Sequence, residues 1–301
     1  MKAAFAGFLF VLSLILGVPT WAAEPVVVAS KIDTEGALLG NIILAVLRSH
    51  GIAVESRLQL GPTSIVRRAI IAGQIDIYPE YTGNGATFFQ RDGDPVWRDP
   101  VKGYETVKQL DHDRNNLIWL APSPADNSWA IAIRADFGAA QKIATLEDFA
   151  TYIGKGGRTK LAASAEFNES PGALPAFQSA YGFTLTRNQK LILIGGNTSA
   201  TIRAAAEGIS GVNAAMAYGT DGALAALHLI ALADDKHVQT VYQPTPVIRA
   251  AVLAQHPEIE TLLDPVFRSL SIERLRALNA KIAVEGAEAS AVASDYLRSV
   301  R

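Results

Sequence analysis

The feature that most constrains the fold is a regular alternation of short, β-branched apolar runs with longer segments that carry apolar residues at helical spacing. Residues 26–30 have the pattern of a buried strand, and residues 34–49 place apolar side chains on one helical face. The same order continues through residues 54–60, 63–72 and 75–81. Strands that alternate with helices in this way predict parallel α/β sheets.

The alternation continues through the middle of the chain and then stops. Further strand-like runs lie at residues 117–120, 128–134, 161–165, 191–194, 214–218 and 238–241. Helical stretches separate most of them, at residues 145–152, 174–181, 199–207 and 222–229. From Pro257 onward only helical spacing is found, so the chain is expected to end in a group of helices.

The N-terminus has the layout of a secretory signal peptide. Met1 and Lys2 give a positive start, residues 3–18 are apolar and uncharged, and small residues precede a cleavage position after Ala22. The alternative is an uncleaved membrane anchor, but a full crossing needs about 20 apolar residues. We predict that residues 1–22 are removed and that the mature chain is exported and soluble.

Composition narrows the compartment and the chemistry. The sequence contains no cysteine, which excludes disulfides, thiolate nucleophiles, cysteine-based zinc sites and a lipid-carrying cysteine. Its formal net charge is -2 with 19% charged residues, so nothing indicates a nucleic-acid-binding surface. A periplasmic protein without a lipid anchor is the prediction that fits these observations.

The length of the chain predicts two domains. About 280 residues remain after cleavage, which is more than one hydrophobic core usually serves. Residues 121–127 are rich in proline and small polar residues and are the best candidate for the first crossing, and the Gly-Thr-Asp-Gly turn after Tyr218 indicates the return. These crossings predict a first lobe from residues 23–125 plus 221–301 and a second lobe from residues 126–220. A ligand is then expected in the crevice beyond the carboxyl ends of the strands.

Four aromatic residues stand near the ends of predicted strands in four separate segments. They are Tyr81, Trp129, Tyr218 and Tyr242. Aromatic faces attract a cation that cannot donate hydrogen bonds, with about 0.5–2 kcal/mol per contact, and methylated ammonium groups are characteristic ligands of such sites. For any one of these residues, core packing is the common alternative. Convergence of all four on one point would indicate a quaternary-ammonium site.

Three motifs give the chain a family resemblance. Ser-Lys-Ile-Asp-Thr-Glu occupies residues 30–35, Ile-Tyr-Pro-Glu-Tyr-Thr-Gly residues 77–83, and Tyr-Gly-Thr-Asp-Gly residues 218–222. With these motifs in this order, the chain resembles the glycine betaine/choline/carnitine-binding proteins of osmoprotectant ABC importers over essentially its whole mature length. Within that family it is most similar to the YehZ/OsmF-type periplasmic branch.

The resemblance implies a type II periplasmic-binding-protein fold, in which two α/β lobes enclose a ligand cleft. It also implies that the ligand is held in a box of aromatic side chains, which by motif are Tyr81, Trp129, Tyr218 and Tyr242. Trp129 stands where the family usually has a tyrosine. A tryptophan keeps the cation–π contact but changes the volume of the box.

One departure from the family pattern concerns the other end of the ligand. Many relatives carry an arginine that binds the ligand carboxylate, and the aligned residue here is Ser170, so a bidentate charge-assisted contact is lost. Lys31 and Asn84, the latter in place of a frequent threonine, are the other candidate donors to the ligand. Weak binding of glycine betaine, or a preference for a ligand without a carboxylate, is the expected consequence.

The resulting hypothesis is a binding module and not an enzyme. It binds a quaternary-ammonium osmolyte as a monomer, without cofactor or metal, and delivers it to an inner-membrane ABC permease and its ATPase. Two alternatives stay open: the same fold with an amino acid or another amine as ligand, and an exported hydrolase. For the hydrolase the sequence shows no nucleophile–base constellation, and the five histidines lack metal-ligand spacing.

Overall fold

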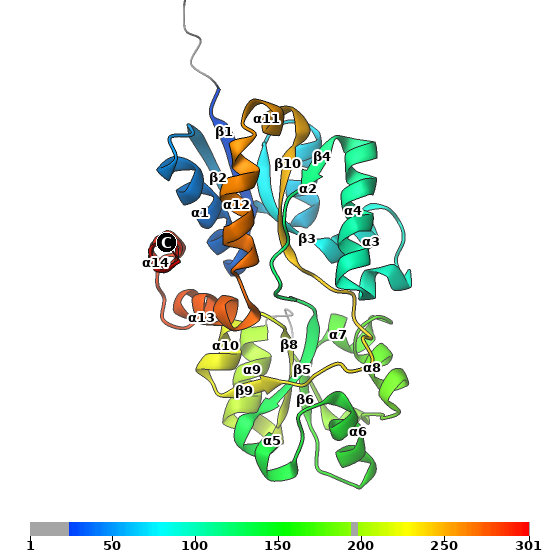
Figure 1. Cartoon of the computed structure of the whole chain (residues 1–301). Coiled ribbons are helices and arrows are strands. Elements are labelled where there is room, and N and C mark those ends of the chain that lie inside the picture. Colours follow the sequence, from blue (N-terminus) through cyan, green and yellow to red (C-terminus); the bar gives the residue numbers. More distant parts are fainter. Residues whose placement is uncertain (1–23, 194–197, 301) are drawn as a thin grey trace, which may run out of the picture.

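The described part of the chain forms two lobes, each built around a five-stranded sheet flanked by helices (Figure 1). The computed structural model describes residues 24–193 and 198–300, so the predicted leader at residues 1–22 lies outside the described residues. The predicted two-lobed α/β architecture is confirmed. Within the described ranges, no helix is long and apolar enough to cross a membrane.

The first sheet is mixed. Its strand order is β2 (Val54–Gly61), β1 (Val26–Lys31), β3 (Ile77–Tyr81), β10 (Pro244–Arg249) and β4 (Leu117–Trp119). β1 pairs in parallel with β2 and β3, whereas β10 lies antiparallel between β3 and β4. The prediction of parallel sheets therefore holds for three strands and is wrong for the side of the sheet that includes β10.

The second sheet has the same mixed character. Its strand order is β7 (Lys190–Leu193), β6 (Leu161–Ser164), β8 (Ala214–Tyr218), β5 (Trp129–Arg134) and β9 (Leu229–Ala231). β6 pairs in parallel with β7 and β8, and β5 runs antiparallel to β8 and β9. In both sheets the antiparallel strand is the one that follows a crossing between the lobes.

The helices divide between the two lobes. The first lobe carries α1 (Thr34–Ser49), α2 (Thr63–Ile71), η1 (Thr82–Asn84), α3 (Gly85–Phe88), η2 (Pro95–Arg98), α4 (Pro100–Asn115), α11 (Ala250–Gln255), α12 (Glu258–Arg268) and α14 (Ala289–Ser299). The second carries α5 (Ala135–Gln141), α6 (Leu146–Gly154), α7 (Ala165–Glu169), α8 (Leu174–Tyr181), η3 (Arg187–Gln189), α9 (Thr198–Glu207), η4 (Ile209–Gly211) and α10 (Gly222–Ala226). The side chain of Asp33 caps α1 by accepting the Gly36 N–H at 2.7 Å, which fixes the start of this helix just after the carboxyl end of β1.

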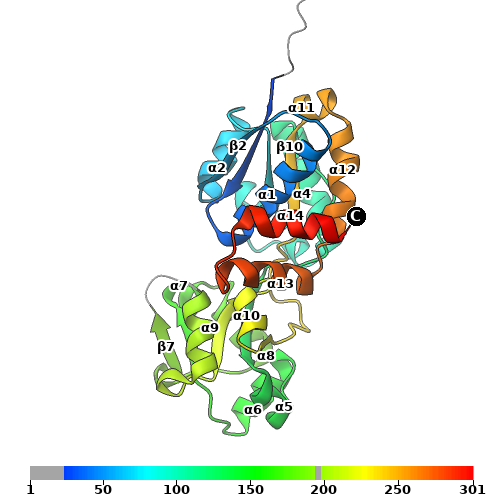
Figure 2. The same cartoon turned by 90° about the vertical axis from the view of Figure 1, so that its left-hand side faces the viewer.

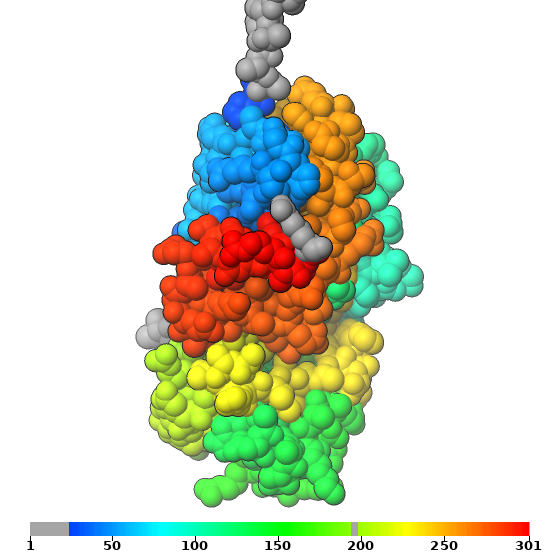
Figure 3. Space-filling model, turned by 60° about the vertical axis from the view of Figure 1, so that its left-hand side comes forward, coloured from blue at the N-terminus to red at the C-terminus, as the bar shows by residue number. Residues whose placement is uncertain are grey.

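Helix α13 (Ile272–Ala283) lies between the lobes, as Figures 2 and 3 show. Asn279 on this helix donates from Nδ2 to the carbonyl of Thr220 at 3.0 Å, in the turn after β8. A Cβ on Gly222 would lie 2.2 Å from the backbone nitrogen of Ala280, so the approach of α10 to α13 requires glycine there. The C-terminal helices therefore connect the second lobe to the first.

Two extended segments also cross between the lobes. Residues 120–128 join β4 to β5, and residues 232–243 join β9 to β10. The segments are hydrogen-bonded to each other: Asn127 N–H donates to the Tyr242 carbonyl at 3.0 Å, and Tyr242 N–H donates to Asp126 Oδ1 at 2.8 Å. The two crossing segments thus form a hydrogen-bonded pair between the lobes.

The return crossing predicted after Tyr218 is wrong. The Gly-Thr-Asp-Gly turn begins α10, and the chain then adds β9 to the second sheet beside β5. Residues 221–231, which were assigned to the first lobe, therefore belong to the second. The chain returns through residues 232–243, and the strand predicted at residues 238–241 is part of that extended crossing.

Candidate ligand site between the lobes

A cavity of about 480 Å³ lies between the lobes, at the carboxyl ends of β1, β3 and β8. Of the residues predicted to bind ligand, Lys31, Tyr81 and Tyr218 line it. The other lining residues are Asp33, Thr34, Glu35, Thr63, Asn127, Thr198, Ser199, Thr220, Asp221, Gly222, Asn279 and Ala283. Both lobes, the first crossing and α13 thus contribute to one site.

Tyr81 is the last residue of β3, and two polar groups hold its buried side chain. Its hydroxyl donates to Glu35 Oε1 at 2.7 Å, and the Lys31 ammonium lies 4.4 Å from the centroid of its ring. Burial, together with the negative charge of Glu35, raises the pKa of Tyr81 well above its ordinary value. The side chain therefore stays a neutral phenol in a fixed orientation.

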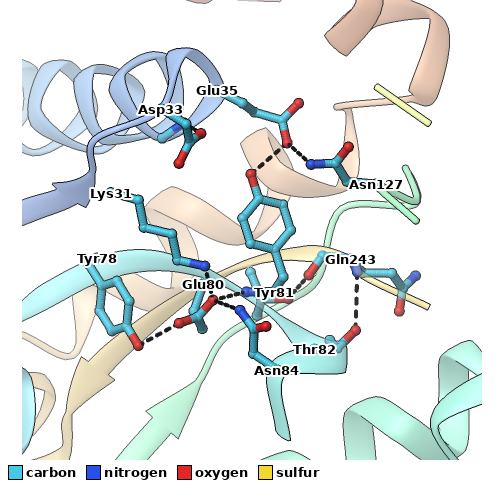
Figure 4. A network of polar contacts seen from close by, with 12 residues as sticks. Lys31, Asp33, Glu35, Tyr78, Glu80, Tyr81, Thr82, Asn84, Asn127 and Gln243 are labelled. Atoms are coloured by element: carbon cyan, nitrogen blue, oxygen red, sulfur yellow. Dashed lines mark hydrogen bonds and ion pairs between the residues drawn. The ribbon is translucent and has the colours of Figure 1, made fainter. Parts of the chain in front are cut away.

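Beside the backbone of Tyr81, four residues form a group that we call the Glu80 cluster: Lys31, Tyr78, Glu80 and Asn84 (Figure 4). The Glu80 side chain is fully buried. Its Oε1 accepts from Lys31 Nζ and from Asn84 Nδ2, the latter at 2.7 Å, and its Oε2 accepts from the Tyr78 hydroxyl at 3.0 Å. The Tyr81 N–H also donates to Oε1, at 2.7 Å. Lys31 and Asn84, predicted as donors to the ligand, therefore donate to this carboxylate.

At the hydroxyl end of Tyr81 lies a second group, the Glu35 cluster: Glu35, Asn127 and Asn279 (Figure 4 labels the first two). Glu35 Oε1 accepts from Asn127 Nδ2 at 3.5 Å in addition to the Tyr81 hydroxyl, and Oε2 accepts from Asn279 Nδ2 at 2.6 Å. These donors come from the first crossing, β3 and α13. Glu35 thus accepts hydrogen bonds from three separate parts of the molecule.

The Glu35 carboxyl titrates near neutral pH. Burial raises its pKa to about 7, and the charge of Asp33 adds to the shift. Hydrogen bonds from Thr220, Tyr81 and Asn279 oppose it because they stabilise the ionised form. Desolvation outweighs these bonds, so the pKa of Glu35 stays above its ordinary value.

Trp129 and Tyr218 are neighbours across the β5–β8 pair of the second lobe. They are paired in register, with ring centroids 6.2 Å apart and planes inclined at 58°. Tyr218 lines the cavity between the lobes, and burial raises its pKa. Trp129 instead lines a second hollow of about 290 Å³ and contacts Phe167, whose ring centroid is 5.2 Å away. The two rings form a pair of which only Tyr218 faces the ligand cavity.

Tyr242 lies in the second crossing, with its ring against the backbone of Gly83. A Cβ on Gly83 would lie 2.8 Å from the Tyr242 ring, so the glycine that ends the Ile-Tyr-Pro-Glu-Tyr-Thr-Gly motif is required by this contact. Burial raises the pKa of Tyr242 to about 12, and the nearby Tyr218 hydroxyl adds to the shift. Tyr242 thus packs from the second crossing against the motif that ends β3.

Not every predicted site residue reaches the cavity. The described residues that line the cavity do not include Trp129, Tyr242, Asn84 or Ser170. Ser170 follows α7, where its N–H donates to the Glu166 carbonyl at 2.8 Å and ends the helix. The structure thus brings Lys31, Tyr81 and Tyr218 together in one cavity wall, and the ligand-binding roles of all seven residues stay predictions.

Sequence reasoning missed the Glu35 cluster. Glu35 is the last residue of the Ser-Lys-Ile-Asp-Thr-Glu motif, which was used to find the family and not to assign a role. For Asn279 the available signal was a polar residue directly after Leu278 on the apolar face of a helix, where it is buried. Asn127 was included only as part of the crossing.

A two-lobed α/β fold with a polar and aromatic cavity between the lobes is typical of substrate-binding proteins. The chain belongs to the family described as the substrate binding domain of ABC-type glycine betaine transport systems, whose model matches residues 24–299. The predicted family and the choice of a binding protein over an enzyme are confirmed by this match.

Individual relatives agree with the family. The chain is 55% identical to the glycine betaine-binding protein YehZ of Escherichia coli K12, over 98% of this chain and 96% of that protein. It is 30% identical to a glycine-betaine-binding protein of Pseudomonas aeruginosa, over 92% of this chain and 88% of that protein. The solved structure of ligand-free YehZ from Escherichia coli superposes with a TM-score of 0.86 at 56% identity, covering 92% of this chain and 99% of that chain.

Proposed function

We propose that this chain binds a small quaternary-ammonium osmolyte, such as glycine betaine or choline, in an aromatic cage and delivers it to an ABC permease that works with an ATPase. It does so as a monomer in the periplasm, after removal of residues 1–22. The observation that carries the proposal is that Tyr81 and Tyr218, from different lobes, line one cavity. The glycine betaine named for the relatives supports the ligand class.

The chemistry of the cavity suits such a ligand. A quaternary ammonium has no N–H to donate, so it is recognised by the faces of aromatic rings, with about 0.5–2 kcal/mol per contact. Burial raises the pKa of both Tyr81 and Tyr218, which keeps these rings neutral. We expect closure of the lobes about the two crossings to complete the cage with Trp129 and Tyr242.

The second candidate is an amino acid or another amine with N–H donors. It is favoured by three carboxyl groups in the cavity wall, those of Asp33, Glu35 and Asp221. Each already accepts a hydrogen bond within the protein at 2.7 Å: Asp33 from the Gly36 N–H, Glu35 from the Tyr81 hydroxyl, and Asp221 from the Tyr218 N–H. Because these carboxylates organise the protein itself, we rank the quaternary-ammonium ligand first.

Calorimetric titration of the mature chain, residues 23–301, tests the proposal. Glycine betaine, choline, carnitine and proline betaine are compared with a panel of amino acids, and at least one quaternary ammonium is expected to bind. Tyr218→Ala should weaken that binding at least tenfold, whereas Tyr152→Ala, which removes a ring of the same lobe that packs on Phe137, should not. Binding of an amino acid in the absence of binding by any quaternary ammonium at millimolar concentration would overturn the proposal.

The proposed compartment has a separate test. Cells that express the full chain should contain a mature protein beginning at Ala23 in the periplasmic fraction. An uncleaved chain that stays with the membrane would contradict the predicted leader while leaving the ligand proposal intact.

A further inference from the structure

Glu35 is the group in the cavity wall that the aromatic cage does not explain. It lies in the first turn of α1, is 6% exposed and lines the cavity between the lobes. The side chains that donate to it, from Tyr81, Asn127, Asn279 and Thr220, are all neutral. A buried carboxylate without a cationic partner is costly unless something else supplies positive charge.

Several of the charged groups around Glu35 are already bonded to other groups. The Lys31 ammonium is bonded to Glu80, and Asp126 and Asp221 accept backbone N–H groups of the crossings and of β8. Arg276 on α13 donates from Nε to the Gly219 carbonyl at 2.7 Å. The charged groups on the elements around Glu35 are Lys31, Asp33, Glu80, Asp126, Asp221, Glu273, Arg274, Arg276 and Lys281. Within the described cavity wall, the lining charges are thus one paired cation and three carboxyl groups.

We propose that Glu35 is a specificity-determining residue of the cleft, whose negative charge balances the bound quaternary ammonium while its hydrogen bond positions the ring of Tyr81. The inference rests on the proposed function, because it assumes that an ammonium group enters this cavity. Glu35 acts on the ligand through space and through Tyr81, to whose hydroxyl it is bonded at 2.7 Å.

Lys31 places a positive charge beside the Tyr81 ring. Its ammonium lies 4.4 Å from the Tyr81 ring centroid, so a second cation in the cavity would be repelled by it. Glu80 neutralises Lys31, and together they contribute no net charge. Beside the aromatic faces, a carboxylate is needed to balance the added charge, and of the three lining carboxyl groups Glu35 is the one bonded to the Tyr81 hydroxyl.

The sign of the pH dependence follows from the direction of the pKa change. Burial raises the pKa of Glu35 to about 7 in the ligand-free protein, and a bound cation stabilises the ionised form and lowers that value. Binding therefore releases a proton at and below neutral pH. Affinity is highest above pH 7 and falls as the pH drops, by about tenfold for each unit by which the ligand lowers the pKa.

The net charge of the ligand should change the size of this pH dependence. Choline carries a net positive charge, whereas glycine betaine is a zwitterion whose carboxylate offsets part of the field at Glu35. The pH dependence is therefore expected to be larger for choline, about tenfold between pH 8.5 and pH 5.5, than for glycine betaine.

The test is a series of calorimetric titrations of the mature chain with choline and with glycine betaine from pH 5.5 to 8.5. Each is repeated in two buffers of different ionisation enthalpy, which counts the protons released without any substitution. Glu35→Gln should abolish both the pH dependence and the proton release, and Glu55→Gln, at an exposed carboxyl on β2, should change neither. Among the described residues Asn279 Oδ1 has no hydrogen-bond partner, so its amide can turn to accept the new Nε2 of the glutamine.

Each outcome decides something different. Binding that is independent of pH in the unsubstituted chain, or a pH dependence that persists in Glu35→Gln, overturns the inference and leaves the proposed function standing. The second result would assign the proton to another carboxyl, such as that of Asp221. No binding of either ligand at any pH overturns the proposed function and this inference with it.

Discussion

Tyr81 is hydrogen-bonded to two buried carboxylates, those of Glu80 and Glu35, whose negative charges are compensated in different ways. In the Glu80 cluster the carboxylate has a cation of its own, Lys31, and also accepts three neutral hydrogen bonds. In the Glu35 cluster the carboxylate accepts hydrogen bonds from neutral groups, and burial raises its pKa to about 7. The first cluster is therefore internally balanced and structural, whereas the second is balanced only when a positive charge or a proton arrives.

The largest expected effect tests the balanced cluster. Glu80→Gln leaves the buried ammonium of Lys31 without its counter-charge, and removing one partner of a buried ion pair typically costs about 3–5 kcal/mol. The free energy of unfolding, measured by urea denaturation of the ligand-free mature chain, should fall by that amount at pH 7. The double variant Lys31→Met, Glu80→Gln is the control, because it removes both charges and should lose less than the sum of the two single variants. A loss below about 1 kcal/mol for Glu80→Gln would show that Lys31 reaches solvent and that the cluster is not balanced as described.

The next effect, of opposite sign, tests the unbalanced cluster. The pKa of Glu35 is raised from 4.5 to about 7 in the folded chain, so its contribution to stability is fully present below about pH 4.5 and is lost as the pH rises through 7. The glutamine of Glu35→Gln does not ionise, so the variant does not show this loss of stability as the pH rises. Relative to the unsubstituted chain, its free energy of unfolding should therefore improve by about 2–3 kcal/mol between pH 4.5 and pH 8.

Urea denaturation without ligand, at four or more pH values, measures this change. The comparison between pH values matters more than the offset at any one of them, since glutamine also rearranges the hydrogen bonds of Asn279 and Tyr81. A difference between the two chains that stays constant from pH 4.5 to pH 8 would mean that Glu35 keeps an ordinary pKa in solution. The contrast between the clusters would then disappear.

The elements that could be predicted from the sequence are those whose pattern is local along the chain. Local apolar spacing predicted β1, α1 and α2 to within two residues, because burial on one face leaves its period in the sequence. β10 was not predicted as a strand, since Pro244 and Pro246 lack the N–H of a regular ladder and usually exclude an inner strand. The tertiary pairing with β3 and β4 overrides this local preference.

The site shows the same limit. Tyr81 and Tyr218 were found from motifs that lie at strand ends, and they meet in the cavity. The bond between Glu35 and Asn279 joins residues 244 positions apart, and no local pattern records such a contact. The cost of burying Glu35 depends on how the whole cleft is assembled, so its pKa could not be inferred from the neighbouring sequence.

The smallest expected effect decides whether Asn84 belongs to the structural cluster or to the ligand site. Asn84 donates to Glu80 Oε1 at 2.7 Å, and Asn84→Thr removes that donor because the shorter hydroxyl does not reach as far. One of several hydrogen bonds to a carboxylate that keeps its cation is lost, so the free energy of unfolding should fall by about 1 kcal/mol. Affinities for choline and glycine betaine should stay within about twofold, and the pH dependence assigned to Glu35 should be unchanged. A selective change for glycine betaine would instead place the residue at the ligand's carboxylate, as the family resemblance implies. Asn84 would then serve both the balanced cluster and the ligand, and the division between a structural and a ligand-responsive end of Tyr81 would have to be redrawn.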